Sequence, residues 1–188
     1  PRLADRWTGE ANGKRLTAPH IVIAAGAEPF VPPIPGLKEA GYLTSDTVWG
    51  IREQPKRLVV LGGGPIGSEL TQAFARLGSQ VTQVEMLPRI LPREDVEISQ
   101  MVFERFKAEG IDVRVNTKAK AVKFVDNEKR LLVEKDGVES EIPFDQILVA
   151  VGRAARLKGY GLENVGVEAG KTIKVNEYLQ TSVPNIYA

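Results

Sequence analysis

The sequence predicts a three-layer α/β fold, in which a parallel sheet lies between helices on one face and an antiparallel β-meander on the other. From Arg57 onward, short apolar runs alternate with amphipathic helical segments, a pattern typical of parallel βαβ units. Within residues 121–142 the hydrophobic period changes to two, with turns at Asp126-Asn127 and Asp136-Gly137, which indicates a meander. A further buried strand at 147–150 follows, so we expect about four or five strands in the sheet.

Two helices and three strands make up the first part of this pattern. The strands are expected at residues 58–61, 80–85 and 111–115, and the helices at 65–77 and 94–109. Gly78 and Gly110 end the two helices. The expected apolar face of the first helix is Ile66, Leu70, Ala73, Phe74 and Leu77, and that of the second is Ile98, Met101, Val102 and Phe106.

The two ends of the chain are less regular. Residues 5–18 predict a hairpin, because Asn12-Gly13 suits a type I′ turn, and a short buried strand is expected at 21–24. Four prolines within residues 29–35 exclude a helix or a central strand there, so this segment is an extended connection. Residues 153–188 are rich in turns, with a short strand candidate at 172–175.

One local pattern occurs twice. Residues 19–27 and 145–153 each follow a hairpin or meander, and each has four apolar residues, the last of which begins Ala-x-Gly. This repetition suggests two related nucleotide-binding units, the first present only as its tail.

Composition narrows the possible functions. The 25 basic and 24 acidic residues are well mixed and give a net charge of +1, so we expect neither a nucleic-acid nor a membrane partner. No apolar stretch reaches the roughly 18 residues of a membrane span. The absence of cysteine excludes disulfides, thiolate metal sites and cysteine redox chemistry within these residues. The chain starts at Pro1 with a polar segment, so we expect an excised or processed fragment of a cytoplasmic protein, and we predict no metal site.

A glycine-rich loop joins the first predicted strand to the first predicted helix. It reads Gly62-Gly63-Gly64-Pro65-Ile66-Gly67, which contains the G-x-G-x-x-G pattern of dinucleotide-binding loops. Gly62 would allow the tight turn, Gly64 the approach of a pyrophosphate to the backbone, and Gly67 the close packing of helix and strand. Pro65 suits the first helical position, and the helix N-terminus offers N–H groups to phosphates. The alternative is a tight strand-to-helix turn with no ligand.

Glu85 ends the next predicted strand, a little over twenty residues after the first glycine, where the dinucleotide fingerprint expects an acid. Its carboxylate can accept hydrogen bonds from the adenosine ribose hydroxyls and would repel a 2′-phosphate. Arg89 is the only arginine that follows closely, and it lies behind a proline. The sequence therefore favours NAD over NADP.

These motifs, together with several others, resemble a known family. The chain is similar to the pyridine nucleotide-disulfide oxidoreductases, nearest to dihydrolipoamide dehydrogenase and mercuric reductase, over essentially its whole length. The residues that carry the resemblance are Leu61–Leu70, Val84-Glu85, Asn116–Lys118, Ala150–Arg153 and Thr181–Ala188. The resemblance implies an FAD/NAD(P)-binding Rossmann-like fold. Residues 1–40 would be the tail of an FAD-binding domain, residues 41–158 an NAD(H)-binding domain, and residues 159–188 a return segment to the FAD-binding domain.

The family also implies roles for single residues. Gly62, Gly63, Gly64, Pro65, Ile66 and Gly67 would cradle NAD(H), with Glu69 near the nicotinamide ribose and Glu85 at the adenosine ribose. Ala119 would line the adenine side, and Gly152 would approach the nicotinamide half. Ala25, Gly26 and Ala27 would contact FAD, although the family usually has threonine at the position of Ala25. No catalytic residue is expected here, and His20 is interpreted as structural.

The family's other functional parts are absent from these residues. Its FAD glycine loop and its redox-active cysteine pair would precede Pro1, and its dimerisation domain with the catalytic histidine would follow Ala188. The segment 152–156 also departs from the usual Gly-Arg-x-Pro-Asn.

Three functional hypotheses follow. In the first, the chain is the NAD(H)-binding domain of a homodimeric flavoprotein oxidoreductase, which passes hydride from NADH to FAD and on to a disulfide or similar acceptor. The isolated chain would then bind NADH without turnover and would self-associate through uncovered apolar surface. The second is a stand-alone NAD-sensing or binding module without catalysis. The third is another flavoprotein of the superfamily, such as an NADH oxidase or a ferredoxin-type reductase.

Overall fold

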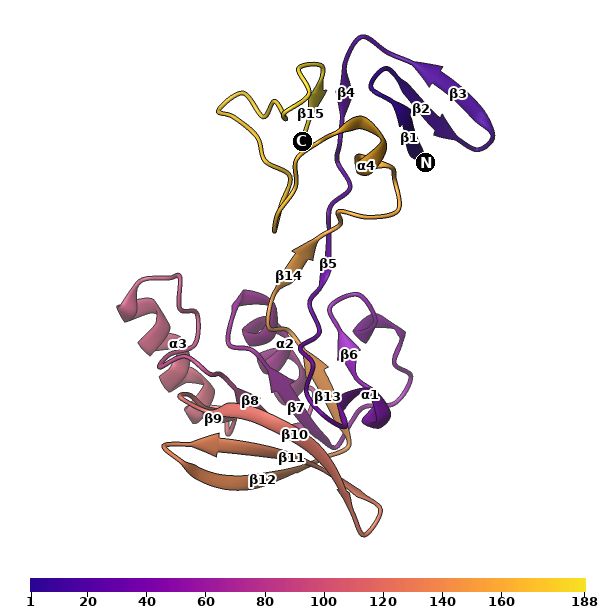
Figure 1. Ribbon diagram of the computed structural model, residues 1–188. Helices are drawn as coiled ribbons and strands as arrows, with labels where there is room; N and C mark the ends of the chain where they lie inside the picture. The colour runs from indigo at the N-terminus through magenta and orange to yellow at the C-terminus, as the bar shows by residue number, and fades with distance from the viewer. The chain divides into compact units, whose positions relative to one another are not determined.

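A computed structural model describes all 188 residues and divides the chain into two compact units (Figure 1). The smaller unit consists of Pro1–Glu28 and Arg153–Ala188, and the larger unit is Pro29–Gly152. The proline-rich segment belongs to the larger unit, because Val31 and Ile34 pack against its core. The compact units therefore divide at 28/29 and 152/153, whereas the domain boundaries expected from the sequence lie at 40/41 and 158/159.

A five-stranded parallel sheet forms the centre of the larger unit, which confirms the α/β prediction. Its strand order is β6-β13-β7-β8-β9. The bounds are β6 Leu43–Thr44, β7 Arg57–Leu61, β8 Gln80–Val84, β9 Asp112–Arg114 and β13 Gln146–Val149. β13 is the last of these strands in the sequence, but it lies between β6 and β7, the first two, because it pairs in parallel with both.

The meander covers one face of this sheet and α2 covers the other. The meander consists of β10 Lys118–Val125, β11 Glu128–Lys135 and β12 Val138–Phe144. Side chains of β7 and β13 alternate between the two faces, as the pleat of a strand requires. Val59 and Ile147 pack with the meander core, whereas Val60 and Leu148 pack with Phe74 of α2 on the opposite face. The three-layer order expected from the sequence is therefore observed.

The helices of this unit are α1 Leu37–Ala40, α2 Pro65–Arg76 and α3 Val96–Ala108, with a short 3-10 helix, η1, at Val48–Gly50. None of the chain's helices combines the length and apolar character needed to cross a membrane.

The expected apolar faces of the two long helices need correction. In α2 the buried residues are Gly67, Ser68, Thr71 and Phe74, whereas Ala73 and Leu77 are exposed. Phe74 is buried as expected, whereas only small side chains face the sheet in the first turns, because α2 approaches the end of β7 closely at Gly67. In α3, Phe106 is buried as expected, but Ile98 and Met101 are exposed, and Ser99 is buried although it was not expected on the apolar face.

The smaller unit begins with three antiparallel strands, β1 Arg2–Asp5, β2 Thr8–Ala11 and β3 Lys14–Thr17. Asn12 and Gly13 have φ of 51° and 73°, so the predicted turn with two positive φ angles is confirmed. The next strand, β4 Ile21–Val22, is shorter than expected and pairs in parallel with β15 Ile186–Tyr187. A three-stranded antiparallel sheet followed by a parallel strand thus occurs in both units, as the repeated sequence pattern suggested.

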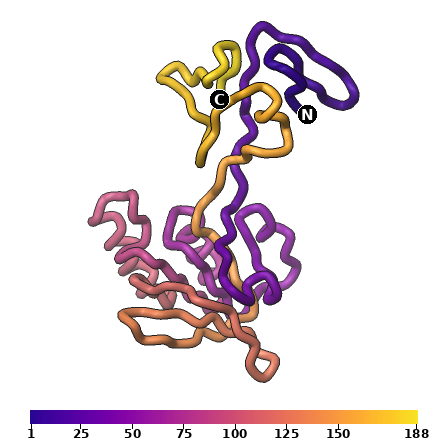
Figure 2. The backbone as a smooth tube through the Cα atoms, in the orientation of Figure 1, coloured from indigo at the N-terminus to yellow at the C-terminus, as the bar shows by residue number.

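The rest of the smaller unit is irregular. Its one helix is α4, Leu162–Val165, and the strands β5 Ala27–Pro29 and β14 Arg153–Ala155 pair as a two-stranded sheet. The strand expected at 172–175 is reduced to an isolated bridge between Ala169 and Ile173. Both ends of the chain lie in this unit (Figure 2).

Candidate functional site

Three strands of the sheet end next to one another and bring the predicted site residues together. Gly62 follows β7, Glu85 follows β8 and Ala150 follows β13. The Gly62 N–H donates to the carbonyl of Val84 at 2.9 Å, and the Ala150 N–H donates to the carbonyl of Leu61 at 2.8 Å. Ligands of open α/β sheets bind beyond the carboxyl ends of the strands, which is where these residues lie.

Three of the loop's glycines are required by the fold itself. Gly62 has φ of +107°, and a Cβ there would lie 2.5 Å from the carbonyl oxygen of Ala150. A Cβ on Gly63 would lie 2.9 Å from the side chain of Ile90. On Gly67 it would lie 2.1 Å from the carbonyl oxygen of Gly62, so this glycine permits the close approach of helix and strand that the sequence predicted.

Gly64 is different, because nothing in the fold requires a glycine there. Its φ of −73° and ψ of 179° are ordinary extended values, and no atom lies within 4 Å of the position a Cβ would take. It is the N-cap of α2, and Pro65 follows it in the first turn, as predicted. The Gly64 N–H has no acceptor within the chain. This open space at a helix N-terminus, with a free donor, suits an anionic group.

Glu85 is tied to the glycine loop. One carboxylate oxygen accepts the Gly63 N–H at 2.5 Å, and the other accepts the Leu87 N–H at 2.8 Å. An ionised carboxylate has about four lone-pair sites, so two such bonds leave capacity for ligand hydroxyls. The Gly63 carbonyl accepts the Leu91 N–H at 2.6 Å, and Leu91 itself has a positive φ of 48°. The sequence placed Glu85 near this loop but gave no sign of the contact with Leu91.

A buried polar cluster lies beneath the loop. The Gln83 side chain donates to the carbonyl of Gly62 and to Ser68 Oγ, both at 3.2 Å, and Ser68 Oγ donates to the carbonyl of Gly63 at 3.3 Å. Sequence reasoning missed both side chains. The available signal was a glutamine inside a central parallel strand, where residues buried on both faces are normally apolar.

The remaining predicted site residues vary in their surroundings. Glu69 is exposed on the first turns of α2 and makes no ion pair. Gly152 is exposed, with φ of +148° and open space around its Cβ position. Ala119 lies on β10 and packs against the meander core, two residues after Thr117, whose N–H donates to the carbonyl of Glu85.

Ala25, Gly26 and Ala27 belong to the smaller unit. The carbonyl of Gly26 accepts the Arg156 N–H at 3.0 Å, and that of Ala27 accepts the Arg153 guanidinium at 2.6 Å. Their contact with FAD stays a prediction.

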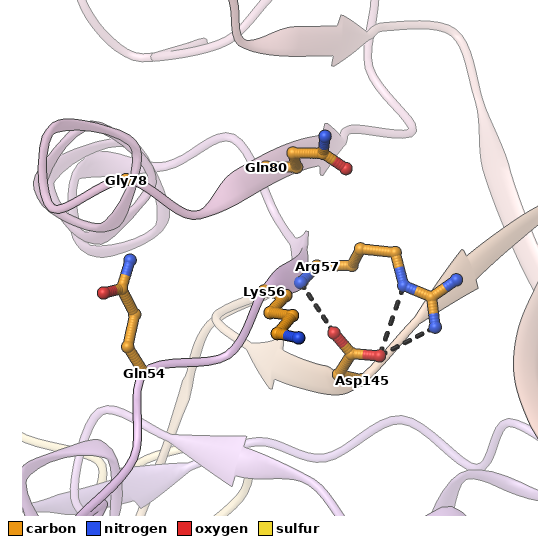
Figure 3. Close-up of a pocket in the computed structure, with 6 residues that line it drawn as sticks. All are labelled: Gln54, Lys56, Arg57, Gly78, Gln80 and Asp145. Carbon is orange, nitrogen blue, oxygen red and sulfur yellow. Dashed lines mark hydrogen bonds and ion pairs between the residues drawn. The ribbon is translucent and has the colours of Figure 1, made fainter.

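The opposite edge of the sheet holds an open depression of about 650 Å³ (Figure 3). Arg57 and Asp145 form an ion pair there, with the Arg57 N–H and guanidinium both donating to the carboxylate. The Arg57 guanidinium holds the pKa of Asp145 below its usual range. Arg57 also pairs with Glu128 of β11, so these charges join sheet and meander. We interpret this edge as structural, because it lies at the amino ends of the strands.

Comparison with known proteins gives a consistent result. The sequence profile of the pyridine nucleotide-disulphide oxidoreductases matches residues 2–188. Mercuric reductase of Staphylococcus aureus is 39% identical over 186 residues, which cover 98% of this chain and 34% of that protein. Dihydrolipoyl dehydrogenase of Acholeplasma laidlawii is 42% identical over 182 residues, covering 94% of this chain and 52% of that protein.

Solved structures agree with the sequence comparison. The HOCl-induced flavoprotein disulfide reductase RclA of Escherichia coli matches with a TM-score of 0.87 and 28% identity, over 99% of this chain and 43% of that protein. The 188 residues therefore span between a third and about half of the length of these relatives.

Proposed function

The chain belongs to the pyridine nucleotide-disulphide oxidoreductase family, and from that premise we propose that its larger unit is the NAD(H)-binding module of a flavoprotein oxidoreductase. Members of the family use FAD and NAD(P). In the parent protein, this module would hold NADH as hydride donor to FAD, from which electrons continue to a disulfide or similar acceptor. The reactivity of the hydride is the nicotinamide's own, and the residues of this chain bind and orient the nucleotide.

The observation that carries the proposal is the environment of Gly64. Gly62, Gly63 and Gly67 are needed for the turn and its packing, but Gly64 faces open space in an ordinary backbone conformation. A tight turn without a ligand explains Gly62, Gly63 and Gly67 but leaves Gly64 unexplained. A pyrophosphate that contacts the Gly64 N–H and the first turn of α2 explains all four.

Glu85 supports NAD over NADP as the nucleotide. Its carboxylate would accept the adenosine ribose hydroxyls, and its negative charge would repel a 2′-phosphate. Arg89, the nearest arginine in sequence, donates to the carbonyl of Pro92 within its own loop and forms no ion pair with Glu85. This bond holds the Arg89 guanidinium within its own loop, so it does not offset the repulsion between Glu85 and a 2′-phosphate.

The other predicted residues complete the proposal. Pro65 and Ile66 lie in the first turn of α2, Glu69 would lie near the nicotinamide ribose, and Gly152 near the nicotinamide. Ala119 would line the adenine side. The smaller unit would be part of the FAD-binding domain, with Ala25–Ala27 at the flavin nucleotide, and dimerisation would use a domain outside these residues.

Isothermal titration of the 188-residue chain with NADH and NADPH tests the assignment. We expect saturable binding of NADH and at least tenfold weaker binding of NADPH, because the second nucleotide places a phosphate against Glu85. No heat with either nucleotide, or tighter binding of NADPH, contradicts the proposal.

A further inference from the structure

Gln83 is a fully buried polar side chain near the carboxyl end of β8. Burial of an amide among apolar side chains destabilises a fold unless the amide is hydrogen-bonded. Gln83 meets this condition only in part, since its Nε2 has two partners and its Oε1 has none. An apolar residue would pack equally well at this position. Packing therefore does not explain why a glutamine occurs here with two hydrogen bonds from its Nε2.

Those bonds fix the direction of the first peptide in the glycine loop. The peptide between Gly62 and Gly63 has its carbonyl held by Gln83 Nε2 and its N–H held by the Glu85 carboxylate. A trans peptide is planar, and its C=O and N–H point in opposite directions. This peptide is therefore fixed at both ends, between a buried amide and the acid that we assign to the adenosine ribose.

The next peptide is the one that faces the open space. Its carbonyl, from Gly63, accepts Ser68 Oγ and the Leu91 N–H. Its N–H belongs to Gly64 and points away from those partners, because the peptide is planar and trans. Gln83 Nε2 also donates to Ser68 Oγ, which leaves the Ser68 hydroxyl hydrogen to donate to the Gly63 carbonyl. Gln83 thus influences both loop peptides, one directly and one through Ser68.

We propose that Gln83, acting with Ser68, is a positioning residue of the dinucleotide site, which directs the Gly64 N–H toward the pyrophosphate. The proposal rests on the function proposed above for the glycine loop. Gln83 does not touch the nucleotide, and its effect reaches the nucleotide only through the orientation of the loop. Preorganised N–H donors bind an anion better than donors that must first be ordered.

The unpartnered Oε1 separates this role from simple stabilisation. Methionine has nearly the shape of glutamine. Gln83→Met removes a buried acceptor that has no donor, but it also leaves the buried Gly62 carbonyl without its donor, so the two effects offset each other in part and the thermal unfolding midpoint should fall only modestly. The same substitution releases the Ser68 hydroxyl. A folded variant whose loss of NADH affinity far exceeds its loss of stability is expected only if Gln83 positions the loop.

Thr71 provides a matched control. It lies on α2, is fully buried, and its hydroxyl also has no partner. Thr71→Val keeps the shape of the side chain, removes one unsatisfied polar atom and leaves the glycine loop's bonds intact. It should therefore leave both the unfolding midpoint and the affinity for NADH close to the wild-type values.

The experiment compares the wild-type 188-residue chain with Gln83→Met, Ser68→Ala and Thr71→Val. Isothermal titration with NADH should show Kd raised roughly tenfold by Gln83→Met, severalfold by Ser68→Ala, and less than twofold by Thr71→Val. ADP-ribose, which retains the pyrophosphate, should show the same losses. Adenosine, which lacks it, should lose less affinity than NADH in Gln83→Met and Ser68→Ala, because it contacts the Glu85 carboxylate but not the Gly64 N–H.

Three results would overturn the proposal. They are a folded Gln83→Met variant that binds NADH within twofold of wild type, an equal loss of affinity in Thr71→Val, and an equal loss for adenosine. Should Gln83→Met fail to fold, Ser68→Ala gives the same comparison.

Amide exchange of the free protein, followed by NMR, distinguishes this proposal from the function on which it rests. The Gly63 N–H should exchange at least tenfold faster in Gln83→Met and unchanged in Thr71→Val, because loosening of the loop frees this hydrogen from Glu85. If the wild type binds no nucleotide, the proposed function fails. The exchange rate then still decides whether Gln83 orders the loop, and an unchanged rate counts against it.

Discussion

Replacement of Gly64 by alanine separates ligand binding from folding more sharply than any other change in the glycine loop. The new Cβ would meet no atom within 4 Å, and the φ of −73° suits alanine. The folded state should therefore carry no strain. The unfolded chain loses freedom when glycine becomes alanine, which stabilises a protein by about 0.4–1 kcal/mol. Alanine is a poorer N-cap than glycine by a comparable amount, and Gly64 is the N-cap of α2. The two effects oppose each other, so the unfolding midpoint should stay within about 4 °C of the wild-type value.

The same methyl group occupies the space that the pyrophosphate would use. Displacing the phosphate from the Gly64 N–H removes a hydrogen bond to a charged group, which contributes about 1.5–3 kcal/mol. Because about 1.4 kcal/mol corresponds to a tenfold change, the Kd for NADH should rise about 10- to 150-fold.

Gly67→Ala is a comparison variant in which the same added methyl group would clash with the fold. Its Cβ would lie 2.1 Å from the carbonyl oxygen of Gly62, a buried backbone atom of the same turn. Alanine is favoured over glycine in a helix by about 1 kcal/mol. Overpacking of a buried site costs typically about 1–3 kcal/mol and more where backbone must move, so we expect net destabilisation.

Thermal unfolding and titration with NADH on the two variants decide the question. The expected pair is a stable Gly64→Ala that binds NADH about 10- to 150-fold more weakly and a destabilised Gly67→Ala. Wild-type affinity in a folded Gly64→Ala would refute the assignment of this space to the pyrophosphate. A large loss of stability in Gly64→Ala would refute the argument that the fold does not need a glycine there.

Further predictions concern charge, packing and association. Glu85→Gln should weaken NADH binding severalfold. It should also reduce the ratio of the NADPH and NADH dissociation constants, because the charge that repels the 2′-phosphate is gone, and titrations with both nucleotides would measure this ratio. A hydrogen bond from Arg76 lowers the pKa of Glu109 from 4.5 to about 2, so the stability that this pair contributes is present above pH 4.5 and is lost as the pH falls toward 2. Denaturant unfolding between pH 2 and 6 should show this slope, and Glu109→Gln should flatten it. Ile147→Ala, at a fully buried position, should cost about 2–5 kcal/mol of unfolding free energy in the same assay. The isolated chain should self-associate through exposed apolar side chains such as Val22, and light scattering that shows a monomer at high concentration would contradict this.

Strands and turns were predictable because their signals are local. The change of hydrophobic period at the meander placed β10, β11 and β12 within a few residues of their observed bounds. Asn12-Gly13 gave the first hairpin for the same reason, since the turn type depends on two adjacent residues. Sheet order is not a local property. The insertion of β13 between β6 and β7 depends on pairing across about a hundred residues, and no short pattern encodes it.

The buried faces of the helices were harder to predict for a different reason. Hydrophobicity alone ranks Leu77 above Ser68, yet Leu77 is 68% exposed and Ser68 is 5% exposed. A helix that starts on a glycine loop lies so close to the adjacent strand at its first turn that only small side chains fit there, whereas Phe74 fits farther along α2. The deciding quantity is the distance between backbones, and the sequence shows it only through the glycines.

The candidate site was predictable where backbone conformation determines residue type. Gly62 and Gly67 are required by positive φ and by close approach, so a pattern of glycines marks them. Glu85 was found from its spacing. Gln83 and Ser68 were missed because their role depends on which carbonyls lie next to them in the folded loop.

The two edges of the sheet show how one unit separates stability from binding. At the amino ends of the strands, the charges of Arg57 and Asp145 are paired, and the pair is joined to the meander through Glu128. At the carboxyl ends, a comparable number of hydrogen bonds is directed inward to hold the glycine loop, and they leave the Gly64 N–H without an acceptor. A free donor in an otherwise satisfied loop does not stabilise the fold. Its presence is explained by a ligand that supplies the missing acceptor, and this is why substitutions at Gly64 and Gln83 should change affinity for NADH without a matching change in stability.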